Sequence, residues 1–143
     1  AKEAAPVVRM SASATLPENC GILLVPMPTA SDVGTFSALA ESPASSGVQG
    51  YSYQTEQGAE FLFVARGSDP WKCGVWASDA QFLYCRLEGG RFAHVIMVAG
   101  SFAEWQGKRF VTRPASGEAF EWPSRLGSKV SADGNLLEDP VRQ

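Results

Sequence analysis

The sequence contains little from which a reaction centre is usually built. It has one histidine and three cysteines in 143 residues, and it lacks the G-x-S-x-G, H-E-x-x-H and glycine-rich phosphate-binding patterns. No apolar stretch approaches the roughly 20 residues that span a bilayer, and no basic segment followed by an apolar stretch leads the chain as given. The sequence therefore gives no reason to expect a cofactor or a membrane partner.

Charge of one sign is not concentrated anywhere. The chain has 12 Lys and Arg against 15 Asp and Glu, a net charge of -3, and its basic residues are scattered. Nonspecific affinity for nucleic acid depends on clustered cations, so no nucleic-acid partner is expected. With 45% hydrophobic residues there is enough apolar material for one core. We expect a single domain over 1–143, with its core in 7–126 and an edge strand and polar tail in 127–143.

Helical periodicity is also missing, because no stretch keeps apolar residues at i, i+3, i+4 and i+7 for ten residues. Short apolar strands separated by glycine turns take its place. A two-residue Gly89-Gly90 turn predicts a β-hairpin with Glu88 beside Arg91. An uninterrupted register would place these pairs on one face: Leu87 with Phe92, Cys85 with His94, and Leu83 with Ile96.

A second hairpin is expected at Gln106-Gly107, pairing Glu104 with Arg109 and Phe102 with Val111. The other strands that the patterns predict are 10–16, 21–26, a short strand or turn at 36–39, 51–55, 60–66, 73–77, 118–122 and 127–134. Consecutive hairpins indicate an all-β fold, an antiparallel β-sandwich of about nine to eleven strands.

The one pair that suggests nucleophilic catalysis is Cys85 opposite His94, because an imidazole can activate a thiol. The same face carries leucine, phenylalanine and isoleucine, so we expect both residues in the core, with no tyrosine beside the histidine. A zinc site from Cys73, Cys85 and His94 lacks a close C-x-x-C pair and a fourth ligand. Three cysteines permit at most one intramolecular disulfide, and whether Cys20 and Cys73 are bonded is left open.

Three glutamates lie near one another in the chain, and two carboxylates at a suitable separation would indicate glycoside hydrolysis. Glu104 already has Arg109 as its expected cross-strand partner, and Glu118 and Glu121 are spaced for the rim of a strand. A solvated or salt-bridged face accounts for all three, so no catalytic residue is predicted.

Aromatic side chains are the better functional lead. Trp71 follows Asp69-Pro70, and Trp105 precedes the Gln106-Gly107 turn, which are positions where an exposed ring can stack on a sugar. The alternative is that the tryptophans pack between the sheets or against a neighbouring domain. The candidate residues for binding a carbohydrate or a partner are Trp71, Trp105, Trp76, Trp122, Tyr51 and Tyr53.

Three stretches together resemble the C-terminal β-domain of polysaccharide lyases of the heparinase II/III type. They run from Ala14-Thr15-Leu16-Pro17 to Val25-Pro26, from Ser78 to Leu87, and from Val98-Ala99-Gly100-Ser101-Phe102 through Trp105-Gln106-Gly107-Lys108. In that family other domains supply the catalytic Tyr, His and Asn or Arg. The resemblance therefore implies a noncatalytic module beside a catalytic domain, in a secreted or periplasmic protein.

Two functions follow as expectations. The first is a noncatalytic accessory β-sandwich of a carbohydrate-active protein, either structural or in contact with a polysaccharide. The alternative is a freestanding protein-binding or assembly domain that uses an exposed aromatic patch. An enzyme acting on its own is not expected, because β-elimination needs a base within about 3 Å of the proton that it removes.

Overall fold

The computed structural model describes residues 34–39, 47–114, 118–123 and 135–136. These residues contain eleven strands and no helix: β1 (Thr35–Leu39), β2 (Val48–Gln54), β3 (Gly58–Ala65), β4 (Trp71–Cys73), β5 (Trp76–Ser78), β6 (Phe82–Glu88), β7 (Arg91–Val98), β8 (Phe102–Trp105), β9 (Lys108–Thr112), β10 (Ala119–Trp122) and β11 (Asn135–Leu136). The prediction of an all-β fold is confirmed.

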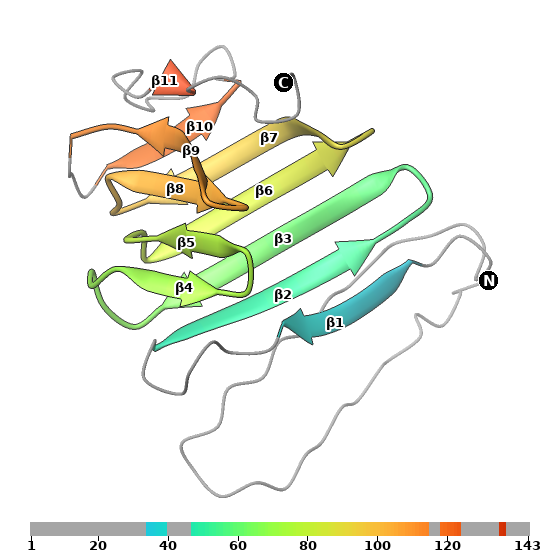
Figure 1. Cartoon of the computed structure of the whole chain (residues 1–143), viewed down its shortest axis with the longest axis horizontal. Coiled ribbons are helices and arrows are strands. Elements are labelled where there is room, and N and C mark those ends of the chain that lie inside the picture. The colour runs from blue at the N-terminus through green and yellow to red at the C-terminus, as the bar shows by residue number, and fades with distance from the viewer. Residues whose placement is uncertain (1–33, 40–46, 115–117, 124–134, 137–143) are drawn as a thin grey trace, which may run out of the picture.

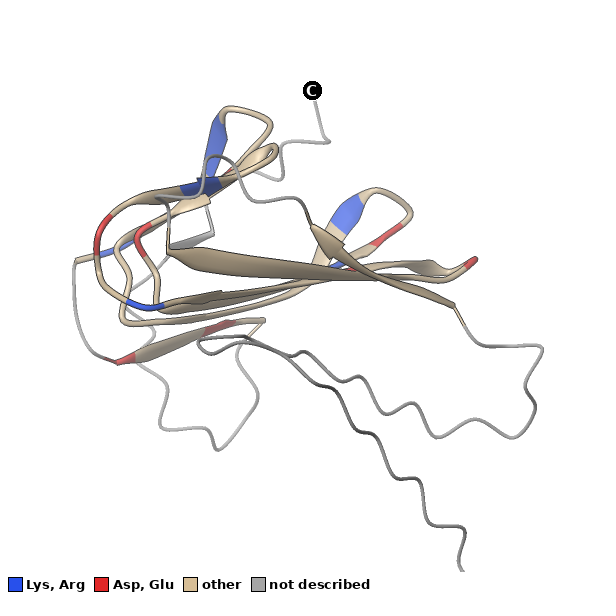
Figure 2. Ribbon diagram, turned by 90° about the horizontal axis from the view of Figure 1, so that it is seen from below, with Lys and Arg blue, Asp and Glu red and all other residues tan. Residues whose placement is uncertain are grey.

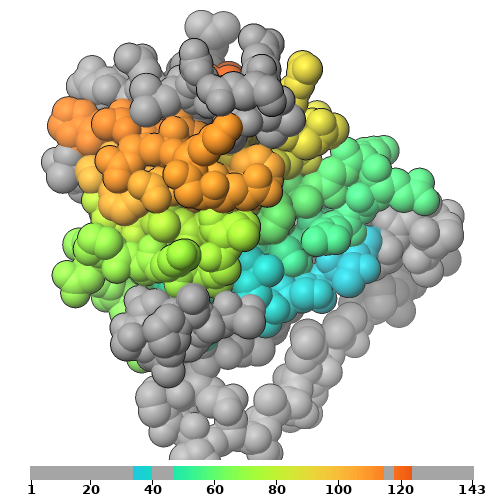
Figure 3. Space-filling model, in the orientation of Figure 1, coloured from blue at the N-terminus to red at the C-terminus, as the bar shows by residue number. Residues whose placement is uncertain are grey.

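The strands form two antiparallel sheets that lie face to face (Figures 1 and 2). The six-stranded sheet has the order β1-β2-β3-β6-β7-β10, and the five-stranded sheet has the order β11-β9-β8-β5-β4. After β3 the chain therefore leaves the six-stranded sheet and forms β4 and β5 in the other sheet. It then returns to the six-stranded sheet, where β6 pairs with β3. The five-stranded sheet covers only part of the larger one, and atoms of β1, β2 and β3 remain visible beside it in Figure 3.

Most of the expected strands that fall on described residues are present. Those expected at 36–39, 51–55, 60–66 and 118–122 match β1, β2, β3 and β10. The single strand expected at 73–77 is wrong, because Gly74 adopts a left-handed φ of 59° and turns the chain between β4 and β5. The strands expected at 10–16, 21–26 and 127–134 lie outside the described residues, as do parts of the expected domain and its tail.

The Gly89-Gly90 hairpin forms as predicted near its turn but not farther along. Both glycines have positive φ, and Glu88 pairs with Arg91 and Leu87 with Phe92. A register shift between Arg86 and Leu87 then gives β7 one extra residue. Arg86 therefore lies opposite His94, Cys85 opposite Val95, and Leu83 opposite Met97. The expected pairs Cys85–His94 and Leu83–Ile96 are wrong, because a one-residue shift exchanges the two faces of a strand.

The second hairpin shows the same combination. Glu104 pairs with Arg109, as expected, but a shift between Ala103 and Glu104 places Ala103, and not Phe102, opposite Val111. The guanidinium of Arg109 lies 3.0 Å from Glu104 Oε1 and 4.4 Å from the centre of the Phe102 ring. Because Ala103 is the buried residue of β8, its neighbour Phe102 lies on the outer side of the five-stranded sheet, beneath this cation.

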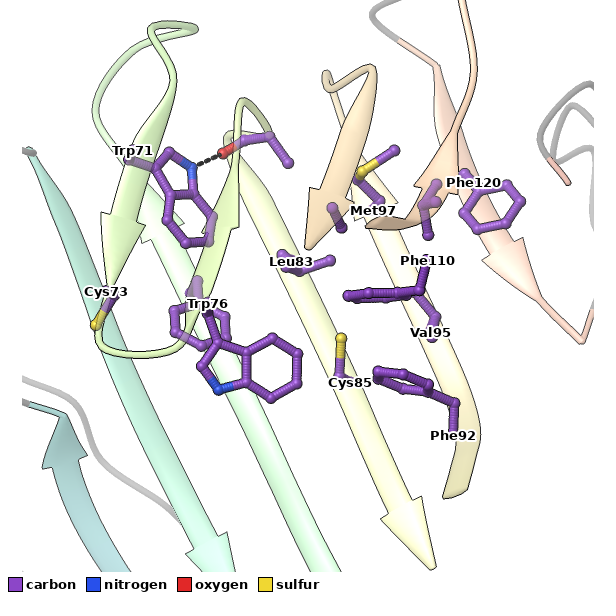
Figure 4. Close-up of a cluster of buried hydrophobic side chains, with 14 of the residues drawn as sticks. Trp71, Cys73, Trp76, Leu83, Cys85, Phe92, Val95, Met97, Phe110 and Phe120 are labelled. Carbon is purple, nitrogen blue, oxygen red and sulfur yellow. Dashed lines mark hydrogen bonds between the residues drawn. The ribbon is translucent and has the colours of Figure 1, made fainter. Parts of the chain in front are cut away.

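A single hydrophobic core fills the space between the sheets (Figure 4). In β6 the alternation is strict, with Leu83, Cys85 and Leu87 buried and the intervening residues partly exposed. Val95 and Met97 continue this face on β7, and Phe110 joins it from β9. At one end, Asp79 Oδ1 accepts hydrogen bonds from the backbone N–H groups of Ser101 (2.7 Å) and Phe102 (3.0 Å), which fixes the entry into β8.

Candidate functional site

The tryptophan placed first among the binding candidates is not exposed. Trp71 is only 3% exposed, and its indole Nε1 donates a hydrogen bond of 2.7 Å to the carbonyl oxygen of Ala80 (Figure 4). Its ring stacks on Phe63 with 5.2 Å between centroids. The expectation of an exposed ring after Asp69-Pro70 is therefore wrong. The turn ends at Pro70, and β4 then directs Trp71 into the core.

Trp76 lies at the centre of an aromatic cluster and is 2% exposed. Its ring contacts five others: those of Phe61, Phe63, Phe92, Trp105 and Phe110. Trp105 does sit beside the expected turn, but it is half-buried and packs against Trp76 and Phe92. Trp122 is also half-buried against the core. The expected alternative, in which tryptophans pack between the sheets, describes these positions.

The remaining two candidates lie elsewhere. Tyr51 and Tyr53 are half-buried on the outer face of the six-stranded sheet, the face that points away from the five-stranded sheet. Tyr51 stacks on Phe36 of β1, with 5.6 Å between centroids and 13° between the planes. The Tyr53 hydroxyl accepts a hydrogen bond of 3.0 Å from the backbone N–H of Gly34, so both ends of this side chain are held.

The only histidine of the sequence is also on this outer face. Because of the extra residue in β7, His94 points away from Cys85, and its Nε2 lies 2.7 Å from Glu121 Oε1 of β10. Both side chains are largely buried, at 12% and 13% exposed. Tyr84 lies edge-on to the imidazole with 5.7 Å between centroids. The expectation that His94 faces the core without a tyrosine neighbour is wrong on both counts.

Tyr84 is also tied to a carboxylate. Its hydroxyl hydrogen-bonds with Glu60 of β3, and burial, followed by the negative charge of Glu60, raises the pKa of Tyr84 to about 12. The phenol is therefore protonated near neutral pH and donates to Glu60. A tyrosine in this state cannot accept a proton from a substrate.

The strand register brings four side chains into one line across the sheet. Tyr53 pairs with Glu60, Glu60 with Arg86, and Arg86 with His94, and we call these four residues the outer polar row. They come from β2, β3, β6 and β7 in that order. Directly opposed residues in antiparallel strands lie about 5 Å apart, so each member is within side-chain reach of the next.

A shallow pocket of about 190 Å³ opens at one end of the outer polar row. Glu88 Oε1 lies 3.1 Å from Arg86 Nε, an ion pair by distance, although this Nε is buried and makes no hydrogen bond. Gly58 leaves the floor without a side chain, and a Cβ at that position would lie 2.1 Å from the carbonyl oxygen of Leu87. The polar side chains around the pocket are those of Tyr53, Thr55, Gln57, Glu60, Arg86 and Glu88.

The β6 residues of this site were not among the expected binding residues, although the sequence does contain a pattern that indicates them. Tyr84, Arg86 and Glu88 alternate with the apolar core residues of β6, so they had to share the opposite face. Two further facts cannot be read from such alternation. One is that β3 and not β5 lies beside β6. The other is that the bulge turns His94 toward the same face.

The carboxylates and thiols that were considered as catalytic or metal-binding groups do not come together in one site. Glu104 pairs with Arg109, as expected, whereas Glu121 contacts His94. Cys73 and Cys85 are both buried and not disulfide-bonded, and burial raises the pKa of the Cys85 thiol well above its ordinary value. Among the described residues no group of three or more His, Cys, Asp or Glu could hold a metal ion. Cys20 lies outside them.

No protein-family model matches the chain, and a search of curated proteins finds no significant match. In the part of the chain that the structure describes, no helix is long and apolar enough to cross a membrane. A function must therefore be inferred from the geometry of the outer face.

Proposed function

We propose that this chain is a noncatalytic β-sandwich module of a carbohydrate-active protein and that it contacts saccharide through the outer face of its six-stranded sheet. The observation that carries the proposal is the pocket at the end of the outer polar row. It combines the ring of Tyr53 with carboxylate and guanidinium groups, a mixture that suits a ligand with one apolar face and many hydroxyl groups. Tyr51 and Phe36 extend the aromatic surface beside it.

The acid–base groups support a binding role over a catalytic one. The Tyr84 proton is committed to Glu60, His94 Nε2 is committed to Glu121, and the Cys85 thiol is buried. A general base must reach the proton that it removes at hydrogen-bond distance. Tyr84 and His94 instead contact carboxylates, Cys85 is enclosed in the core, and the pocket lies on the far side of Arg86 from His94 along the outer polar row.

A glycan array probed with the purified chain tests the binding role. We expect retention of a subset of glycans and a loss of at least tenfold in affinity for Tyr53→Ala. Phe102→Ala is the matched control, because it removes an aromatic ring from the outer side of the opposite sheet. Absence of binding to every glycan would contradict the proposal, as would equal losses in the two variants.

Catalysis is tested separately by incubating the chain with polyuronates and following the absorbance of unsaturated elimination products. We expect no turnover. A measurable turnover that His94→Ala abolishes would place the chain among enzymes, whatever the array shows.

A second candidate function is assembly with another protein. Phe36 is 41% exposed and Val64 is 46% exposed, and both lie on the same outer face. A contiguous apolar patch is typical of a contact surface, and these residues are connected because Phe36 stacks on Tyr51, which pairs with Leu62 beside Val64. Sedimentation of the purified chain at increasing concentration tests this alternative. It requires that copies of the chain associate and that Phe36→Asp weakens their association.

A further inference from the structure

The charges around the pocket bear on which kind of saccharide it accepts. Two carboxylates, Glu60 and Glu88, line it together with one guanidinium, Arg86, so the lining has one excess negative charge. Glu88 Oε1 lies 3.1 Å from Arg86 Nε, so an anion that approaches this guanidinium also approaches a carboxylate. Arg91 pairs with Glu88 across the hairpin but does not line the pocket.

This charge balance disfavours an acidic ligand. A uronate carboxylate placed against Arg86 would also face Glu60 and Glu88, and like charges a few ångströms apart repel at the surface of a protein. A neutral sugar meets no such cost. Its hydroxyl groups can donate hydrogen bonds to the carboxylate oxygens and accept them from the guanidinium. Such charge-assisted hydrogen bonds are favourable.

The size of the pocket also limits the ligand. At about 190 Å³ it is smaller than the roughly 300–1,000 Å³ of sites that enclose drug-sized molecules. It therefore suits one sugar residue, with the rest of a chain lying over the adjacent sheet surface. Tyr53 is held at its hydroxyl by Gly34 and at its backbone by the β2–β3 pairing, so its ring is fixed before a ligand arrives.

We infer that the pocket formed by Tyr53, Glu60, Arg86 and Glu88 binds a single residue of a neutral polysaccharide and rejects polyuronates. This inference rests on the proposed function and names its ligand class. It differs from what a lyase-type module beside an acidic substrate would need, because here the lining carries more negative than positive groups.

The test compares matched hexasaccharides that differ only in the carboxylate, by titration calorimetry at low salt. Cellohexaose is compared with the β-1,4-linked hexaglucuronate, and β-1,4-mannohexaose with hexamannuronate. We expect the neutral member of at least one pair to bind tenfold or more tightly than its acidic counterpart. The preference should narrow at about 1 M salt, where the screening length falls to about 3 Å.

Variants that remove charge then test whether the lining carboxylates cause the preference for the neutral hexasaccharide. Glu60→Gln with Glu88→Gln leaves Arg86 as the only charged side chain of the lining, and the glutamine at position 60 can still accept from Tyr84. We expect this double variant to lose most of the discrimination against hexaglucuronate or hexamannuronate. Glu104→Gln is the matched control, because it removes one carboxylate from the other sheet and should leave the preference unchanged. Circular dichroism confirms that each variant is folded.

The outcomes separate the two proposals. Tighter binding of the acidic members would overturn the neutral class while leaving saccharide binding in place. Neutral binding that Tyr53→Ala and the double variant leave unchanged would show that the pocket is not the site. Absence of binding to all four hexasaccharides and to the array would overturn both.

Discussion

At the scale of single residues, side chains in this protein are fixed by hydrogen bonds that their sequence neighbours do not reveal. Trp71 is an example, because its indole is buried and donates to the Ala80 carbonyl oxygen at 2.7 Å. Replacing Trp71 with Phe keeps an aromatic ring but leaves this buried carbonyl without its donor. We expect a loss of about 1–3 kcal/mol in the free energy of unfolding, measured by urea denaturation. Trp105→Phe makes the same change at a half-buried ring and should cost less. Equal costs would mean that the hydrogen bond contributes nothing.

Tyr84 leads to a prediction about pH. The unfolded chain loses a phenol proton near pH 10, whereas in the folded chain burial and Glu60 raise the pKa of Tyr84 to about 12. Between these values the folded state holds more proton, so this residue's contribution to stability is complete below pH 10 and falls as pH rises toward 12. The difference in unfolding free energy between the wild type and Tyr84→Phe should therefore be constant up to about pH 9 and shrink above pH 10. A difference that stays constant to pH 11 would contradict the raised pKa.

At the scale of strands, the two hairpin turns at 89–90 and 106–107 and the pairs beside them were predictable, whereas the turn at Gly74 and the registers beyond the bulges were not. Gly89, Gly90 and Gly107 all adopt positive φ, which glycine accepts without strain, and so the hairpin turns could be located from the sequence. The extra residue in β7 has no such marker, because Ala93 fits a regular strand equally well. The candidate site depends on this bulge and on the pairing of β3 with β6, which are separated in the chain by β4 and β5. Tyr53 of β2 was among the predicted binding residues, and alternation could have added only the β6 members.

The register of β7 can be tested with two neighbouring truncations. Met97 is fully buried and Ile96 lies on the outer face, whereas an uninterrupted hairpin would exchange them. We expect Met97→Ala to lower the unfolding free energy by about 2–5 kcal/mol, as truncation of a buried side chain does. Ile96→Ala should cost less than half as much. The reverse order in urea denaturation would indicate that the bulge is absent.

At the scale of the whole molecule, the two sheets share one core, and Cys73 and Cys85 lie inside it from opposite layers. Neither thiol should react with a bulky thiol reagent while the sheets are together, because access is blocked and burial raises the pKa of Cys85. We expect both to become labelled over the same range of urea in which the far-ultraviolet β signal is lost. Peptide mapping assigns each label to its cysteine and keeps Cys20 apart from the other two. Labelling of Cys73 well before Cys85 would show that β4 separates from the larger sheet before global unfolding, and rapid labelling of Cys85 in the folded protein would overturn the shared core itself.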